Sequence, residues 1–556
     1  MLSDIEIAQK CVLEPIQKIA AKAEIAAEFV EPYGRYKAKI DLALSQQLAQ
    51  QKNGKLVYVT AITPTPAGEG KTCTAIGITQ ALARLRQKVM LCLREPSLGP
   101  TFGIKGGAAG GGYSQILPME EINLHFTGDI HAVTATHNLL SALIDNHLVQ
   151  GNPLQIDPKR VVWRRVMDIS DRQLRNIVVG LGGKSDGIVR ESGFDITAAS
   201  EIMAILCLTT GIEDLKTRLG RILVAYKYDG QPVFARDLKA VGAMAVLLKD
   251  ALKPNLVQTV EGQPALVHGG PFANIAHGNN SVLATRLALK LADVVVTEGG
   301  FAADLGAEKF FDIVSPYTGI KPDVAVLVVS IRALKFHGGV VKEELTRENL
   351  AALERGFVNL ERHFNNLRQV YRLPVVVAIN HFPSDTQNEL DCVVANCRKL
   401  GASCAVSKVV AEGGPGGMEL AEKILAALQE PNQFQPLYTS DLPLPEKIKT
   451  VATRIYGADG VSFSKEAEQT LKRLSEQGYG HLPVCIAKTQ MSFSDNPNLK
   501  GAPSGWTLNV REVRLMAGAG FVTVIAGTMM TMPGLPKIPA AEQVDLLEDG
   551  SIVGLF

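Results

Sequence analysis

The chain has 556 residues, which is too long for one hydrophobic core and predicts about three domains. Hydrophobic residues make up 46% of it and charged residues 20%, as is usual for a folded globular protein. The 57 Lys and Arg residues balance the 56 Asp and Glu residues without forming a basic stripe. The composition therefore argues against a nucleic-acid-binding protein and is compatible with small anions bound at local sites.

The chain begins without a basic segment followed by an apolar run, so we expect no secretion signal. One stretch, residues 515–536, carries no charge, but its Gly, Thr and Pro content favours a buried strand followed by a packed loop over a membrane span. The eight cysteines are scattered, as in reduced thiols of a cytosolic protein. We expect a cytoplasmic protein without membrane association.

The first clear structural unit lies at residues 55–93. The apolar run 55–62 predicts a buried strand, and residues 72–88 have the period of a helix that ends in basic residues. The run 88–93 predicts a second strand. Strand, helix and strand at this spacing indicate a βαβ unit with parallel strands.

Further buried-strand patterns follow at 176–181, 293–297, 324–330 and 374–380, with helical patterns between them. This alternation predicts an α/β fold. We expect a P-loop-type, mostly parallel sheet in a large N-terminal nucleotide-binding domain, residues 1–362. Two smaller α/β or α+β domains would follow, at 363–440 and 441–556, with the Pro-rich stretch 429–447 as the best linker candidate.

The connection between the first strand and helix, "TPTPAGEGKT" (Thr63 to Thr72), is close to a phosphate-binding loop. Thr65 stands where the usual pattern has its first glycine. Backbone N–H groups around Gly70 can face phosphate oxygens, Lys71 supplies a charge, and the Thr72 hydroxyl can hold Mg²⁺ bound to ATP. The predicted nucleotide-binding residues are Thr65, Pro66, Ala67, Gly68, Glu69, Gly70, Lys71, Thr72 and Cys73.

Arg94 follows the second strand as the loop follows the first, so both open on one edge of the sheet. An arginine there can bind a phosphate or carboxylate bidentately. The glycine-rich stretch 103–113 comes next and favours a nest of backbone donors or a close-packed wall over a flexible linker.

Taken together, several stretches resemble the formate–tetrahydrofolate ligase family over essentially the whole chain. They are "TPTPAGEGKT", "LREPSLGP", "FGIKGGAAGGGY", "HGGPFANIAHG", "TEGGFAADLGAEKF", "SIRALKFHGG", "AKTQMSFSDNPNLKGAP" and "MTMPGLPKIPAA". The resemblance implies ATP-dependent joining of formate to tetrahydrofolate through formyl phosphate. It also implies a monovalent cation, K⁺ or NH₄⁺, and a homotetramer.

The resemblance implies roles for individual residues as well. Lys71 and Arg94 would be catalytic, and the domain 363–440 would help to form the folate site. The substrate-binding residues would be Arg94, Glu95, Gly106, Gly107, Phe301, Phe382 and Val410. Phe301 and Phe382 match aromatic positions that would contact the folate.

The sequence also departs from the family pattern. Val410 stands where the family commonly has a tryptophan, which would leave a one-sided aromatic clamp opposite Phe382. Cys73, Asn279, Met491 and Thr528 are further departures. Two alternatives therefore stay open: a divergent ligase with a weakened folate site or another amine acceptor, and a nucleotide-gated switch or binding module.

Overall fold

The computed structural model describes residues 2–66, 68–103, 109–183 and 185–555. Seven neighbouring strands of its main sheet run parallel. In spatial order they are β15 (Pro264–Val267), β4 (Val89–Leu93), β16 (Val294–Glu298), β3 (Lys55–Ala61), β17 (Val324–Ser330), β18 (Val375–Asn380) and β19 (Ser403–Ser407). The α/β prediction is confirmed.

These strands are apolar runs because both faces of the sheet are covered by helices. In β3, Leu56 and Tyr58 face a core that includes α11 (Val282–Leu291) and α14 (Leu350–Asn365). Val57 and Val59 face the opposite core, with α4 (Lys71–Arg84) and α17 (Met418–Ala427). Every residue of β17 is buried. The carboxyl ends of all seven strands therefore meet at one edge of the sheet.

The predicted βαβ unit is present, with one difference. Strands β3 and β4 are parallel as expected, but β16 lies between them and pairs with both. A strand from some 200 residues later in the sequence is thereby placed beside the loop that follows β3. The local sequence pattern of residues 55–93 cannot predict this insertion, because it depends on pairing with a strand that is distant in the sequence.

The other side of the sheet is antiparallel. Strand β14 (Asn255–Thr259) pairs with β15, β2 (Ala38–Ile40) and β6 (Ser114–Leu117), and β1 (Val30–Pro32) completes this edge. The short strand β5 (Gly110–Gly111) pairs with β6. This places the end of the glycine-rich stretch against the main sheet.

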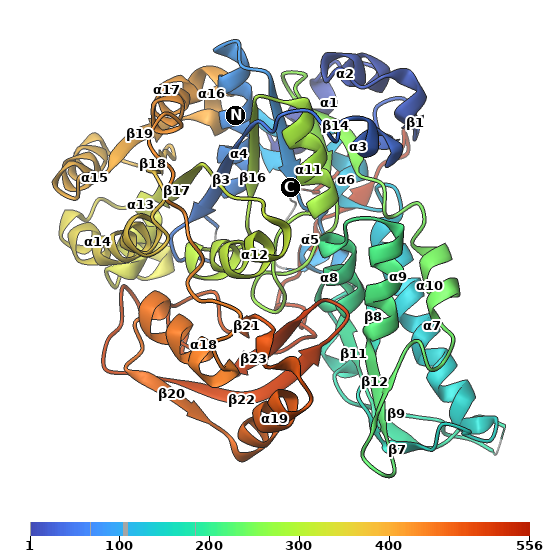
Figure 1. Cartoon of the computed structure of the whole chain (residues 1–556). Helices are drawn as coiled ribbons and strands as arrows, with labels where there is room; N and C mark the ends of the chain where they lie inside the picture. Colours follow the sequence, from blue (N-terminus) through green and yellow to red (C-terminus); the bar gives the residue numbers. More distant parts are fainter. Residues whose placement is uncertain (1, 67, 104–108, 184, 556) are drawn as a thin grey trace.

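A second sheet lies below the main one in Figure 1 and has the order β20 (Gly460–Phe463), β22 (Thr507–Met516), β23 (Phe521–Ala526), β21 (Val484–Ala487). The uncharged segment 515–536 holds the end of β22, a turn, β23 and a loop. The segment is therefore part of a β-hairpin followed by a loop. The predicted buried strand is β23, and the end of β22 that precedes it was not predicted. No helix among the described residues is long and apolar enough to cross a membrane.

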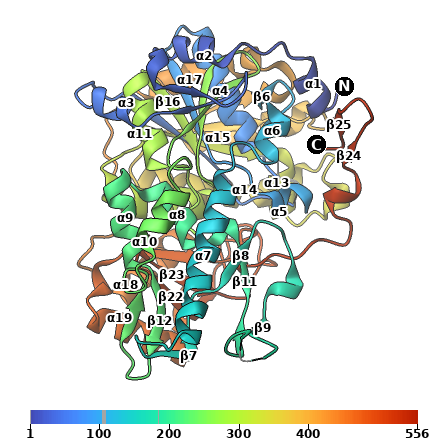
Figure 2. The ribbon, with the colours of Figure 1, turned by 90° about the vertical axis from the view of Figure 1, so that its right-hand side faces the viewer.

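Two further parts complete the chain. An extension built on α7 (Asp129–Val149), β7 (Ile156–Val161) and β12 (Leu223–Lys227) projects at the lower right of Figure 1. The C-terminal tail returns to α1 (Asp4–Lys10), where the Gln9 side chain donates to the Ile552 carbonyl at 3.3 Å (Figure 2). The domain borders remain predictions, and the main sheet itself continues across 362/363 into β18 and β19.

Close packing of α14 on α13 (Ile331–His337) gives a stability prediction. A methyl group on Gly356 would lie 1.8 Å from the Leu334 carbonyl oxygen, whereas one on Gly242 of α10 (Val241–Leu247) would meet nothing within 4 Å. Gly356→Ala should destabilise by more than about 2 kcal/mol, although alanine favours helix. The control Gly242→Ala should stabilise by about 0.5–1 kcal/mol. Thermal unfolding of both variants checks this, and a midpoint for Gly356→Ala at or above that of the parent would contradict the packing.

Candidate active site

The conformation of the loop between β3 and α4 depends on its two glycines, Gly68 and Gly70. Gly68 and Gly70 adopt left-handed conformations, with φ of +79° and +69°. Only glycine adopts such angles without strain. Gly70 also lies so close to Asn380 that a Cβ atom there would be 2.2 Å from the Asn380 Nδ2 atom. The glycines of the predicted nucleotide loop are therefore required by the fold around them.

Glu69 fastens this loop to neighbouring strands. Its carboxylate accepts a hydrogen bond from the Thr65 backbone N–H at 2.7 Å and one from the Ser330 hydroxyl at the end of β17. Its backbone carbonyl accepts from Asn380 Nδ2, at the end of β18, at 3.0 Å. Burial raises the pKa of the Glu69 carboxyl to about 7, against the hydrogen bonds that lower it. Glu69 thus has an anchoring role in the loop.

Lys71 and Thr72 open helix α4 and face the end of β16. The Lys71 ammonium donates to the Phe301 carbonyl at 3.0 Å, and the Thr72 hydroxyl donates to the Glu298 carboxylate at 3.0 Å. Burial lowers the pKa of Lys71 to about 8; Arg94 adds to this shift and Glu298 opposes it. A charged lysine and a hydroxyl therefore lie together where the loop ends.

Arg94 lies at the end of β4, on the far side of β16 from the loop. Its Nη2 atom is 3.8 Å from Glu298 Oε1, and its Nη1 atom donates to the Pro271 carbonyl at 3.2 Å. Its Nε atom is buried and has no hydrogen-bond partner among the described residues. An arginine held in this way keeps donors available for an oxyanion.

Glu95 lies deeper than Arg94. It is 4% exposed, and its backbone N–H donates to the Gly269 carbonyl at 2.8 Å. Burial and the neighbouring Asp129 carboxylate raise the pKa of the Glu95 carboxyl well above its usual range. Its Oε2 atom has no hydrogen-bond partner within the described part of the chain. The structure therefore brings Lys71, Thr72, Arg94 and Glu95 to one edge of the sheet, as the sequence predicts.

The three predicted folate residues lie at different places along this edge. Phe301 follows β16 and has a left-handed backbone, φ +57°, which is strained for a phenylalanine. Phe382 follows β18, and β3 and β17 separate the two preceding strands, by about 14 Å at the usual strand spacing. The two residues therefore follow strands that are three positions apart along this edge.

Val410 lies in the short helix α16 (Val409–Glu412), after β19 and next to the glycine-rich stretch. Its carbonyl accepts from the Tyr113 N–H at 2.9 Å. A Cβ atom on Gly112 would be 2.8 Å from Val410 Cγ1. Val410 is therefore packed beside Gly112, in the helix that follows β19, and β19 is the strand next to β18, which leads to Phe382.

The remaining predicted residues are only partly described. Thr65 is buried, Pro66 is exposed and Cys73 is half-buried near the start of α4. Ala67, Gly106 and Gly107 lie outside the described residues. Gly110 and Gly112, farther along the glycine-rich stretch, have φ of +90° and +57°.

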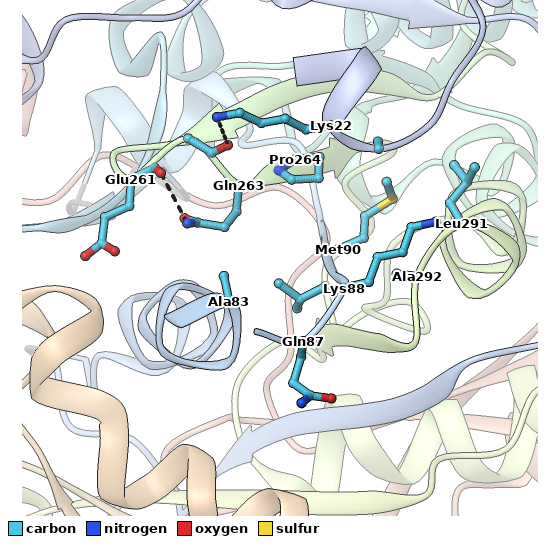
Figure 3. Close-up of a pocket in the computed structure, with 13 residues that line it drawn as sticks. Lys22, Ala83, Gln87, Lys88, Met90, Glu261, Gln263, Pro264, Leu291 and Ala292 are labelled. Atoms are coloured by element: carbon cyan, nitrogen blue, oxygen red, sulfur yellow. Dashed lines mark hydrogen bonds between the residues drawn. The ribbon is translucent and has the colours of Figure 1, made fainter. Parts of the chain in front are cut away.

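A pocket of about 220 Å³ lies elsewhere, among Lys22, Ala83, Gln87, Met90, Gln263 and Pro264 (Figure 3). Met90 and Pro264 belong to the starts of β4 and β15, and Ala83 to the end of α4. This pocket is at the amino ends of the strands, opposite the loop. Ligands of open α/β sheets bind at the carboxyl ends, so the candidate site is at the other edge.

Glu298 is the residue that motif reasoning missed. It is 2% exposed and receives the Thr72 hydroxyl while lying near Arg94. Its signal in the sequence is an acidic residue at the end of an apolar strand, in "DVVVTEGG". That signal gains meaning only when β16 is known to lie beside β3.

Comparison with known proteins decides the family. The family model described as formate–tetrahydrofolate ligase matches residues 2–556. The chain belongs to the formate–tetrahydrofolate ligase family. A relative named formate–tetrahydrofolate ligase, from Symbiobacterium thermophilum, is 58% identical over 556 residues, which cover the whole of both chains. The suspected resemblance is thus confirmed, and this member of the ligase family is an enzyme.

Among the ligase-family departures, Asn279 is well accommodated. Its Oδ1 atom accepts from the Tyr58 hydroxyl at 2.5 Å, and its Nδ2 atom donates to the His277 carbonyl at 2.6 Å. It is 1% exposed. Asn279 therefore has its buried polar groups satisfied. Thr528 is exposed and Met491 half-buried, and nothing in the structure explains these two departures.

The negative charge of Glu298, which acts on Lys71, gives a prediction about the pKa of the lysine. Because the Glu298 carboxylate raises the pKa of Lys71, the Glu298→Gln variant should have a Lys71 pKa below about 8. The measurement is the pH dependence of acetylation of Lys71, followed by mass spectrometry, with exposed Lys342 as the internal reference. Glu343→Gln, on the surface, is the matched control. An unchanged or higher midpoint for Lys71 in Glu298→Gln would refute the coupling.

Proposed function

We propose that the protein joins formate to tetrahydrofolate at the expense of ATP, giving 10-formyltetrahydrofolate, ADP and phosphate through formyl phosphate. The full-length family match carries this proposal. The cluster of Lys71, Thr72 and Arg94 at one sheet edge supports it, because phosphoryl transfer needs cations and preorganised donors around negative oxygens.

The two steps follow from the chemistry of formate. A formate carboxylate resists nucleophilic attack, so one of its oxygens first attacks the γ-phosphorus of ATP, and ADP leaves. The resulting formyl phosphate has a good leaving group. The N10 amine of tetrahydrofolate then attacks the formyl carbon, the C–O bond to phosphate breaks, and the amine loses a proton. No covalent enzyme intermediate is needed.

The loop and Glu298 would carry the first step. Backbone N–H groups at Gly68 and Gly70 would bind the phosphates, and Lys71 would stabilise the charge on the transferring phosphoryl group. Thr72 and Glu298 provide a hydroxyl and a carboxylate, oxygen ligands that fit the Mg²⁺ of ATP. Mg²⁺ would neutralise phosphate charge when bound there.

Arg94 would hold the formyl phosphate and then the departing phosphate. Its Nε atom, which has no partner among the described residues, leaves a donor for a bidentate oxyanion contact. Glu95 adjoins it, and Gly106 and Gly107, outside the described residues, are proposed to line the same substrate site.

The folate would lie along the same edge of the sheet, across the ends of the strands beyond the loop. We assign Phe382 as its main aromatic wall and Phe301 as a second contact, with Val410 on the opposite side of the clamp. Because Val410 cannot stack, folate binding is expected to be weaker than with a tryptophan there, by about 0.5–1.5 kcal/mol. This supports the divergent-specificity alternative without displacing the main proposal.

Other parts of the proposal rest on the family alone. They are a monovalent cation, K⁺ or NH₄⁺, a homotetrameric assembly and a cytoplasmic location. No group of three or more His, Cys, Asp or Glu side chains suited to a metal ion occurs within the described ranges.

A direct assay tests the proposed reaction. Protein, MgATP, formate and tetrahydrofolate at millimolar concentrations should give a product that acid converts to an absorbing species. Lys71→Met should lower kcat/KM about 10²–10³-fold, whereas surface Lys342→Met should not change it. Absence of folate-dependent product would reject the proposal. Formate-dependent ATP turnover indifferent to tetrahydrofolate would favour another amine acceptor, and turnover indifferent to formate would favour a nucleotide switch.

The clamp gives a separate prediction. Val410→Trp should lower the folate KM about three- to tenfold, with little change in the formate KM, because it restores a stacking wall. Val246→Trp, on the exposed side of α10, is the control. Steady-state kinetics with each substrate varied in turn checks this. An unchanged folate KM would mean that Val410 does not line the site.

A further inference from the structure

Arg332 occupies the same sheet edge, on the other side of the loop from Arg94. It follows β17, in the first turn of α13, and β17 lies between β3 and β18. Its guanidinium carbon is 3.9 Å from the centre of the Phe382 ring, over the ring face. At this distance the cation is attracted by the ring and fixes its orientation.

The guanidinium makes no hydrogen bond or ion pair with another described residue. Its Nε atom is buried without a partner. By contrast, the fully buried lysines all have partners. Lys39, Lys335 and Lys488 each have a carboxylate at 2.7–2.8 Å. Lys309 and Lys447 donate to backbone carbonyls. A partly buried guanidinium without a carboxylate is costly unless something else satisfies it.

Polar atoms around Phe382 are also unsatisfied. Asn380 and Ser407, at the paired ends of β18 and β19, are fully buried, and their Oδ1 and Oγ atoms have no partner among described residues. Asp385 accepts the Phe382 N–H at 2.8 Å through Oδ2 and leaves Oδ1 unpartnered. Unpartnered buried polar atoms are rare in native proteins. Of these atoms, the Ser407 hydroxyl can donate to an oxyanion, whereas Asn380 Oδ1 and Asp385 Oδ1 can accept from N–H or O–H groups of a ligand.

Arg332 also acts on the charges nearest to it. It contributes to lowering the pKa of the Glu69 and Asp385 carboxyls, although burial raises both. The positive charge of Arg332 therefore influences both Glu69 in the loop and Asp385 in the turn that carries Phe382. A ligand that joins these two places passes Arg332.

We propose that Arg332 is a ligand-binding residue, held against Phe382 and binding an oxyanion of the ligand on the β17–β19 side of the edge. The inference deepens the proposed function and rests on it. The reaction offers two oxyanions of the right class, a nucleotide phosphate and a carboxylate of the glutamate tail of the folate. Both suit a guanidinium, which can bind either bidentately.

Truncated ligands distinguish the two sources. Equilibrium dissociation constants are measured for tetrahydrofolate and tetrahydropteroate, which lacks the glutamate, and for ADP and adenosine, which lacks the phosphates. For each pair, the affinity of the anionic ligand divided by the affinity of its truncated analogue measures the contribution of the anionic group. In Arg332→Met one of these ratios should fall about tenfold or more relative to the parent protein, as expected for loss of a charge-assisted hydrogen bond. The pair that responds identifies the oxyanion.

Controls keep the result decisive. Arg347→Met, at an arginine whose side chain is 80% exposed, should leave both ratios unchanged. If circular dichroism shows that Arg332→Met does not fold, Arg332→Gln takes its place with the same expectation. Ratios equal to those of the parent protein for both pairs overturn the proposal. Parent activity in the ligase assay is measured separately, so failure of the inference is distinct from failure of the proposed function.

Discussion

Glu69 is the group on which the geometry of the site depends. Its carboxylate takes the Thr65 N–H and the Ser330 hydroxyl, and its carbonyl takes the Asn380 amide. One residue therefore ties the loop after β3 to the ends of β17 and β18. Together with the bonds of Lys71 to Phe301 and of Thr72 to Glu298, these contacts hold the loop against three strands of the sheet.

Charge along the sheet edge is arranged around this anchor. On one side, Glu298 lies between Thr72 and Arg94, and its negative charge offsets the repulsion between Lys71 and Arg94. On the other side, Arg332 lies over Phe382 without a carboxylate partner in the described ranges. In the proposed reaction, Arg94 would hold the transferred phosphate, and Arg332 would bind a further oxyanion of a ligand on the other side of the loop.

The sequence predicted what depends on local pattern. Buried apolar runs identified β3, β4, β16, β17 and β18, because strands covered on both faces cannot alternate in polarity. The same rule was wrong at 176–181, where β9 (Ile177–Val179) lies in a two-stranded antiparallel sheet and is partly exposed. The glycine positions and Lys71 identified the loop. The sequence could not predict features that depend on pairing between distant segments. One is the insertion of β16 between β3 and β4, which places Glu298 beside the loop. The other is the contact of Arg332 with Phe382. The motif match to the family supplied the substrate residues that no spacing rule would give.

The central claim is that this edge activates formate by transferring phosphate to it. The most direct test uses formate labelled with ¹⁸O together with MgATP and tetrahydrofolate. Since the oxygen that attacks the γ-phosphorus stays with the phosphate when the C–O bond breaks, one ¹⁸O should appear in each phosphate released, as read by mass spectrometry. Phosphate free of label, formed together with the folate product, would contradict the account.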